Sequence, residues 1–204
     1  MPRVLYQSIL GESLKQVPPQ IREMHIFARR AAGTANVWWG ASPAARLICR
    51  LASLPQARDK APIETSFTEI DGGERWVRRF DGQPFATDMI AGNDEAFPCM
   101  LERLGPFLFK MRVTASSEGI DLTPEHVFLG PVKIPKALAP KATGRERVVD
   151  DRYSLSVEVS FPLVGKVFGY AGTIEPCELV SDHDPAELDP SAQSRSTPDV
   201  QIKA

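Results

Sequence analysis

Several residue types and motifs that carry common chemistries are scarce or missing in this sequence. It has three histidines and three cysteines among 204 residues, and no cysteine pair or cysteine with histidine has metal-ligand spacing. Phosphate-binding glycine loops, the zinc-protease motif H-E-x-x-H and the hydrolase motif G-x-S-x-G do not occur. We therefore expect no metal and no cofactor, and the cysteines are predicted to be reduced and mainly to pack.

Long apolar runs are also missing. No stretch reaches the roughly 18 to 20 residues of a membrane-spanning helix, so no transmembrane segment is expected. The first residues lack the apolar centre of a signal peptide, which predicts a cytoplasmic location. A formal charge of −2 and a pI near 6.0 give no reason to expect nucleic acid as a partner. With 43% hydrophobic residues the chain has enough apolar material for one core.

The first quarter of the chain has a helical pattern. Apolar residues at helical spacing predict a helix over about residues 3–17, which two prolines end. An extended stretch from Phe27 to Trp39 is expected next. Ser42 and Pro43 suit the start of a second helix. That helix is expected to bury one apolar stripe in the core, made of Leu47, Ile48, Leu51 and Leu54.

From Pro62 onward the apolar residues alternate with period two, which is typical of strands. Short connections such as Asp71-Gly72-Gly73 predict that successive strands pair antiparallel. We predict one α+β domain over residues 1–180, with two N-terminal helices packed on a strongly curved antiparallel sheet or open β-barrel of about eight strands.

The last segment, residues 181–204, differs from the rest. It contains no aromatic residue and has five acidic residues against two basic ones, a net charge of −3. This composition predicts a disordered acidic tail. The Asp182-His183-Asp184 triplet resembles metal ligands only superficially, because a site in such a tail would have to become ordered on binding.

The landmarks along the chain resemble a known family. They are Tyr6-Gln7, the strand Gly73-Glu74-Arg75-Trp76-Val77-Arg78-Arg79-Phe80, Glu102-Arg103-Leu104-Gly105-Pro106, Leu138-Ala139-Pro140, Glu146, Pro162-Leu163-Val164-Gly165 and Tyr170-Ala171-Gly172. Through these landmarks, residues 4–176 resemble the bacterial domain of unknown function 4166. Members of that family look like stand-alone proteins or C-terminal partners of saccharopine-dehydrogenase-like and epimerase-like oxidoreductases. The resemblance implies an accessory role beside an oxidoreductase, and it supplies no functional residues.

One strand stands out as a candidate site. Alternation places Glu74, Trp76, Arg78 and Phe80 on one face. This face could line a partly wet cavity that takes a ligand with an apolar body and an anionic end. Alternatively, Glu74 and Arg78 pair with each other and Trp76 covers an edge of the core.

Other candidates are weaker. The strand from Tyr153 to Phe161 has a continuous apolar face that would point inward if the sheet forms a barrel. The connector residues Lys133, Lys136, Lys141, Arg145 and Arg147, less Glu146, carry a local charge of +4. That charge suits either a solvated loop or an anionic headgroup or membrane surface. Glu102 and Glu146 are candidate acid or base residues, whereas His126 fits a packed position.

Two classes of function fit these patterns, and the sequence does not identify a ligand. The first is an accessory or ligand-binding domain for a small amphipathic or anionic molecule, working with an oxidoreductase. The second is an enzyme that acts on such a ligand through glutamate and arginine side chains. A structural protein-interaction domain is a third reading.

Overall fold

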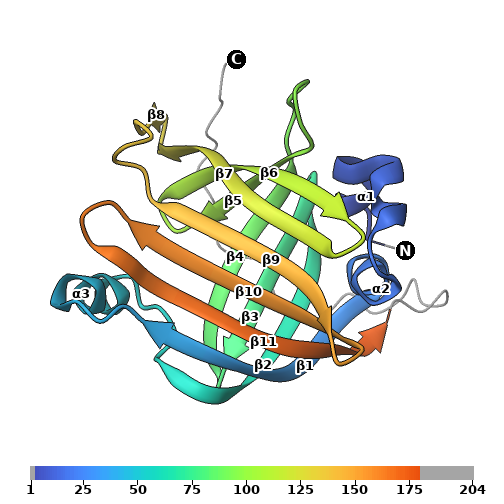
Figure 1. The fold of residues 1–204 in the computed structure, drawn as a ribbon, viewed down its shortest axis with the longest axis horizontal. Coiled ribbons are helices and arrows are strands. Elements are labelled where there is room, and N and C mark those ends of the chain that lie inside the picture. The colour runs from blue at the N-terminus through green and yellow to red at the C-terminus, as the bar shows by residue number, and fades with distance from the viewer. Residues whose placement is uncertain (1–2, 180–204) are drawn as a thin grey trace, which may run out of the picture.

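Residues 3–179 are described in the computed structural model of the chain (Figure 1). The helices are α1 (Leu5–Leu10), the 3-10 helix η1 (Gly11–Gln16), α2 (Pro19–Ile26) and α3 (Pro43–Leu51). The strands are β1 (Ala28–Trp39), β2 (Arg58–Ile70), β3 (Gly73–Phe80), β4 (Gln83–Ala91), β5 (Cys99–Leu104), β6 (Phe107–Ser116), β7 (Gly119–Leu129), β8 (Val132–Lys133), β9 (Lys141–Val149), β10 (Arg152–Phe161) and β11 (Gly165–Leu179).

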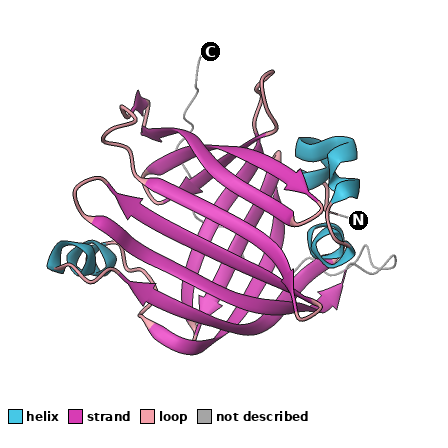
Figure 2. Ribbon diagram, in the orientation of Figure 1, coloured by secondary structure: helices cyan, strands magenta, loops and turns pink. Residues whose placement is uncertain are grey.

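All described strands belong to one antiparallel sheet that closes on itself (Figure 2). Its order is β6-β5-β4-β3-β2-β1-β11-β10-β9-β7-β8, and pairing of β6 with β7 closes every strand except β8 into a ring. The general prediction of an α+β domain on a strongly curved antiparallel sheet or open barrel is therefore confirmed, and the barrel is closed rather than open. The predicted number of about eight strands is wrong, since ten described strands form the ring and β8 is an extra one.

The position of β1 in the ring explains why the barrel has more strands than predicted. β1, which the sequence marks only as an extended stretch, pairs with β2 on one side and with β11 on the other. Ala28 lies opposite Leu179, and Trp39 lies opposite Phe168. The first strand thus joins the last one, which no local pattern in the sequence indicates.

The first predicted helix is broken into three pieces. α1 ends at Gly11, whose φ of 51° and ψ of −128° lie in a region that only glycine adopts readily. The chain then continues as η1 and, after Pro18, as α2. The prediction of a single helix over residues 3–17 is therefore wrong, although the apolar residues Leu10, Leu14 and Val17 are buried as expected.

The helices lie at opposite ends of the barrel (Figure 1). The segment from α1 to α2, here called the N-terminal plug, buries Tyr6, Ile21 and Met24 at the end where β1 begins. α3 lies at the other end, against β1 and β11. We call these two ends the plug end and the α3 end.

The N-cap of α3 is as predicted, but its buried face is not. The Ser42 hydroxyl accepts a hydrogen bond from the amide of Ala45. Ala45 and Cys49 are the residues that pack on the barrel, whereas Leu47 and Leu51 are 55% and 78% exposed. The predicted core stripe is therefore wrong for Leu47 and Leu51 but holds in part for Ile48 and Leu54, which are partly buried against the core. α3 contacts only one end of the barrel, so a narrow strip of its surface is buried.

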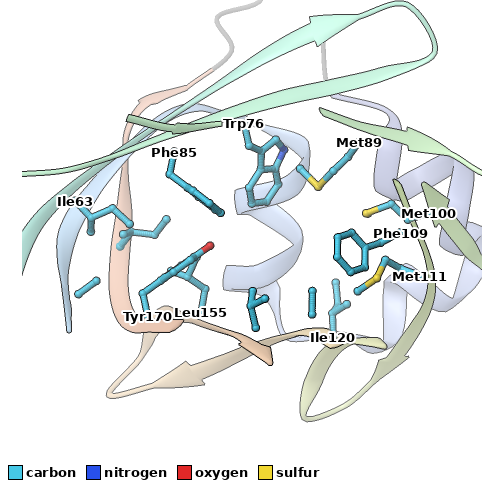
Figure 3. Packing of buried hydrophobic residues seen from close by; sticks show 14 of the residues in the cluster. Ile63, Trp76, Phe85, Met89, Met100, Phe109, Met111, Ile120, Leu155 and Tyr170 are labelled. Atoms are coloured by element: carbon cyan, nitrogen blue, oxygen red, sulfur yellow. The ribbon is translucent and has the colours of Figure 1, made fainter. Parts of the chain in front are cut away.

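Inward-facing residues of successive strands form the core (Figure 3). Alternation along each strand places large side chains inside, and Figure 3 shows Trp76, Phe85, Phe109 and Tyr170 pointing into the barrel. The apolar face of β10 also points inward, with Tyr153 and Leu155 buried. The interior is therefore filled mainly by side chains.

Candidate functional site

The four predicted site residues of β3 all point into the barrel. Glu74, Trp76, Arg78 and Phe80 are each at most 5% exposed, whereas Arg75 between them lies outside and pairs with Asp88. They do not share one environment, however. Only Trp76 and Arg78 line the interior cavity described below.

Glu74 belongs to the plug end instead. Its carboxylate pairs with Arg3 and accepts a hydrogen bond of 2.9 Å from the Trp76 indole. The expected alternative of a Glu74–Arg78 pair is wrong, because the N-terminal plug brings Arg3 to Glu74. Phe80 packs on Tyr170 near the α3 end, with ring centroids 4.8 Å apart.

Glu146 also holds the N-terminal plug in place. Its carboxylate lies 2.5 Å from the His25 imidazole and accepts a hydrogen bond of 3.2 Å from the Tyr6 hydroxyl. Tyr6 stacks on His25 at 3.6 Å between ring centroids. The barrel thus presents two buried carboxylates at the plug end. Arg3, just before the plug, pairs with Glu74, and His25 and Tyr6 of the plug contact Glu146, while Oε1 of Glu74 is buried without a hydrogen-bond partner. Glu146, a candidate acid or base in the sequence, has structural partners here.

Arg78 lies in a small chamber inside the barrel, here called the polar chamber after the polar groups near Arg78, although apolar side chains form most of its wall. One guanidinium nitrogen donates to the Thr87 hydroxyl at 3.1 Å, and the Trp76 ring lies 4.9 Å away. Its Nε is buried without a hydrogen-bond partner. Within residues 3–179 no carboxylate forms an ion pair with Arg78, although its side chain is almost fully buried.

Three titratable groups face this arginine. Burial raises the pKa of Glu102, and the nearby Arg78 charge lowers it in part. Burial likewise raises the pKa of Tyr170 to about 12 and holds the pKa of Tyr153 well above 10.0, with the Arg78 charge again opposing the shift. Both tyrosines are therefore neutral hydrogen-bond donors at neutral pH.

The polar chamber adjoins a larger apolar pocket. The chamber has a volume of about 40 Å³, above the roughly 10–15 Å³ that a cavity needs to hold a water molecule. A second pocket of about 360 Å³, the mouth pocket, lies at the α3 end. Both are lined by Phe85, Leu104, Phe109 and Val159.

The mouth pocket is built from four parts of the chain. It is lined by the end of α3 and the following loop, the start of β4, the β5–β6 turn with the start of β6, and the end of β10 with the start of β11. Ile48 and Leu54, which the sequence assigned to the core stripe, contribute to this lining. The pocket is predominantly apolar, with Phe107, Phe161 and Phe168 among its walls.

Most of the remaining predicted candidates lie elsewhere. In the basic connector, Arg147 pairs with Asp121 at 2.7 Å, and Lys133 and Lys136 lie at the α3 end. Burial lowers the pKa of His126, which lies outside the polar chamber. The Asp182-His183-Asp184 triplet and the predicted tail lie outside the described residues.

Sequence reasoning named Glu102 and the β10 face but missed Thr87 and Tyr170 as neighbours of Arg78. Thr87 alternates with Phe85 and Met89 in β4, so it is a polar residue on an otherwise apolar inward face. Tyr170 occupies the equivalent kind of position in β11. A search for polar residues on apolar strand faces would have found both.

The structure thus defines a closed antiparallel β-barrel with a buried cationic chamber and an apolar mouth. The chain belongs to the family described as Domain of unknown function (DUF4166), whose sequence profile matches residues 17–174. No curated protein and no solved structure matched the chain. In the described part of the chain, no helix has the length and apolar character needed to cross a membrane.

Proposed function

We propose that this barrel binds a small amphipathic anion, with its charged head against Arg78 and its apolar body in the mouth pocket. The observation that carries the proposal is the buried guanidinium without an ion-pair partner among residues 3–179. Burying a charge without compensation costs several kcal/mol, so such a group is retained where something else offsets that cost. A ligand carboxylate would do so.

The surroundings of Arg78 support this orientation of the ligand. The Tyr153 hydroxyl is buried without a hydrogen-bond partner, and like the guanidinium it can donate to an anion. The chamber has room for a carboxylate but not for an apolar chain. At about 360 Å³ the mouth pocket falls in the usual range of roughly 300–1,000 Å³ for ligand sites, and it adjoins the chamber through shared walls.

The first test is Arg78→Met, which removes the charge while roughly conserving volume. An intrinsically fluorescent polyene fatty acid and the corresponding fatty alcohol are titrated into each protein. Loss of the charge-assisted hydrogen bond should weaken binding of the acid by about 1.5–3 kcal/mol, about tenfold or more. Binding of the alcohol should change little, since it carries no charge.

Arg75→Met is the matched control, because Arg75 lies on the outer face of the same strand. Denaturant unfolding is measured in parallel. Arg78→Met should leave the free energy of unfolding unchanged or raise it, since an unpaired buried charge costs stability. Equal affinity of both variants and wild type for the acid would exclude the chamber as the anion site.

A second candidate function is an enzyme that acts on such a ligand, and the raised pKa of Glu102 favours it. A carboxyl group that stays protonated nearer to neutral pH can act as a general acid. For this function, Glu102→Gln should abolish turnover of a ligand that the variant still binds. If wild type binds neither acid nor alcohol, the third reading, a structural protein-interaction domain, gains support.

The setting of the protein is part of the proposal. Cys49 and Cys99 are free and buried and Cys177 is free, which suits a reducing compartment such as the cytoplasm. Work beside an oxidoreductase in a bacterium remains an expectation from the family resemblance. Mass spectrometry of small molecules that remain bound through native purification would identify the ligand directly.

A further inference from the structure

The two ends of the barrel carry opposite charge. Because successive strands run antiparallel, their connections alternate between the ends. The connections at the plug end (71–72, 92–98, 117–118 and 150–151) contain no lysine or arginine and six acidic residues, Asp71, Asp94, Glu95, Glu118, Asp150 and Asp151. Those at the α3 end (40–57, 81–82, 105–106, 130–140 and 162–164) contain four basic residues, Arg46, Arg50, Lys133 and Lys136, and one acid, Asp81.

The single acidic residue of the α3-end connections is itself neutralised, since Asp81 pairs with Arg58. Lys141 is the first residue of β9 and Lys166 the second residue of β11, and both add positive charge to this end. Lys166 pairs with Glu158 at 2.5 Å. The N-terminal plug does not change the contrast, because its Glu12 and Glu23 are balanced by Lys15 and Arg22. Two pairs reduce the contrast: Asp94 at the plug end pairs with Lys110 at 2.7 Å, and Lys136 at the α3 end lies 3.9 Å from Glu125. The described connections still differ in the sign of their net charge between the two ends.

Large apolar side chains protrude from the same α3 end. Leu163, at the tip of the β10–β11 turn, is fully exposed, and Leu138 and Val132 in the 130–140 connection are 64% and 65% exposed. On α3, Leu47 and Leu51 face solvent one turn apart, next to Arg46 and Arg50. A short helix with leucines flanked by arginines on its outer face is typical of helices that lie in a membrane interface.

The plug end also has exposed apolar residues, including Phe27 and Val149. Val149 directly precedes Asp150 and Asp151, which an anionic surface would repel. The plug end also has exposed arginines, Arg29 and Arg152, so the α3 end differs in that its described connections contain no unpaired acid. These side chains stand on separate connections at the α3 end, an arrangement that fits a deformable surface better than a protein partner, which would need a matching hollow for each of them.

We propose that the α3 end docks on an anionic lipid bilayer, with Leu47, Leu51, Leu138 and Leu163 at the boundary of headgroups and acyl chains. Arg46, Arg50, Lys133 and Lys136 then face the lipid phosphates. Docking in this orientation turns the mouth pocket, which lies at the α3 end, toward the hydrocarbon. Docking itself does not depend on the proposed function, whereas uptake of an amphipathic ligand directly from the bilayer rests on it.

The test is co-sedimentation of the full chain with vesicles of phosphatidylcholine alone or mixed with phosphatidylglycerol. Binding should require phosphatidylglycerol and weaken as salt is raised. Arg46→Gln with Arg50→Gln should weaken it about fivefold for each arginine removed. Leu47→Ser with Leu51→Ser should also release the protein from vesicles.

Matched controls lie at the other end of the barrel. Val149→Ser and Arg29→Gln change an exposed apolar and a basic residue near the plug end and should bind vesicles as wild type does. Equal binding to both lipid mixtures, or no loss in the α3 variants, would overturn the proposal. Binding of an acidic protein through Leu47 and Leu51 without any vesicle binding would also overturn it.

Failure of docking and failure of ligand binding are separable. The Leu47→Ser, Leu51→Ser variant should still bind free fatty acid in solution, because neither residue lines the mouth pocket. Conversely, Arg78→Met should still sediment with vesicles. Thermal melting of every variant confirms that a lost signal does not come from unfolding.

Discussion

At the residue scale, the most unusual feature of the protein is the group of polar side chains around Arg78. Glu102, Tyr153 and Tyr170 each face the guanidinium, and burial raises the pKa of each, which favours its neutral form. Burial thus disfavours the charged form of each group that could compensate the arginine. Under the proposed function, an anionic ligand would supply the compensating charge.

The raised pKa of Glu102 leads to a prediction about pH dependence. Its pKa in the folded protein lies above the ordinary value of 4.5, so between the two values the folded state binds more protons than the unfolded state. The stability that wild type has relative to Glu102→Gln should therefore be greatest at low pH, fall as pH rises through this window and then level off.

Urea unfolding of both proteins from about pH 4 to about pH 8 measures this difference. Glu118→Gln, in the exposed β6–β7 turn, is the control for removal of a carboxylate from the surface. A difference that stays constant with pH, or that grows in favour of wild type as pH rises, would contradict a buried and destabilised Glu102 carboxylate.

At the element scale, the N-terminal plug and α3 have different roles. The plug is fixed by buried polar contacts to Glu74 and Glu146 and by its apolar residues, so it closes its end of the barrel. α3 is attached by Ala45 and by Cys49, whose thiol donates to the Val167 carbonyl at 3.2 Å. With its leucines facing solvent, α3 is the less firmly packed of the two and borders the mouth pocket.

This difference predicts the effect of two similar substitutions. Leu51→Ala removes a side chain that is 78% exposed and should change the free energy of unfolding by less than about 0.5 kcal/mol. Ile63→Ala removes a side chain of β2 that is 1% exposed and should cost about 2–5 kcal/mol. Denaturant midpoints compare the two, and a large loss for Leu51→Ala would mean that α3 packs through its leucines after all.

At the scale of the whole molecule, stability depends on closure of the ring between the first and last strands. β1 and β11 pair along almost their entire length, so residues near both ends of the described chain share one ladder. Contacts this distant in sequence cost loop-closure entropy and form only when the whole barrel forms. The barrel should therefore unfold as one cooperative unit.

Truncation tests both the ring and the predicted tail. A chain that ends at Val180 keeps every described pair of β11, so its melting temperature should equal that of the full chain. A chain that ends at Gly172 loses the pairing of Ile174 with Gly33 and Tyr153 and should melt at a much lower temperature. A clear loss of stability on removal of residues 181–204 alone would mean that the tail packs on the domain.

The sequence by itself determined the features that depend on neighbouring residues. Period-two alternation gave the strands of residues 62–174 and the shared face of Trp76 and Arg78, because strand geometry fixes them locally. The short connections gave the antiparallel pairing of successive strands. Ser42 likewise indicated the start of α3 through a contact only three residues away. The landmark residues identified the family that the profile match confirms.

Only the tertiary structure decided which distant groups meet. Closure of the ring placed β1 against β11, and docking of the plug paired Glu74 with Arg3 rather than with Arg78. The partly exposed position of α3 left Leu51 in solvent, although its spacing suggests a core residue. Pairings between residues that lie about 70 to 150 positions apart depend on the global path of the chain, and no local periodicity encodes that path.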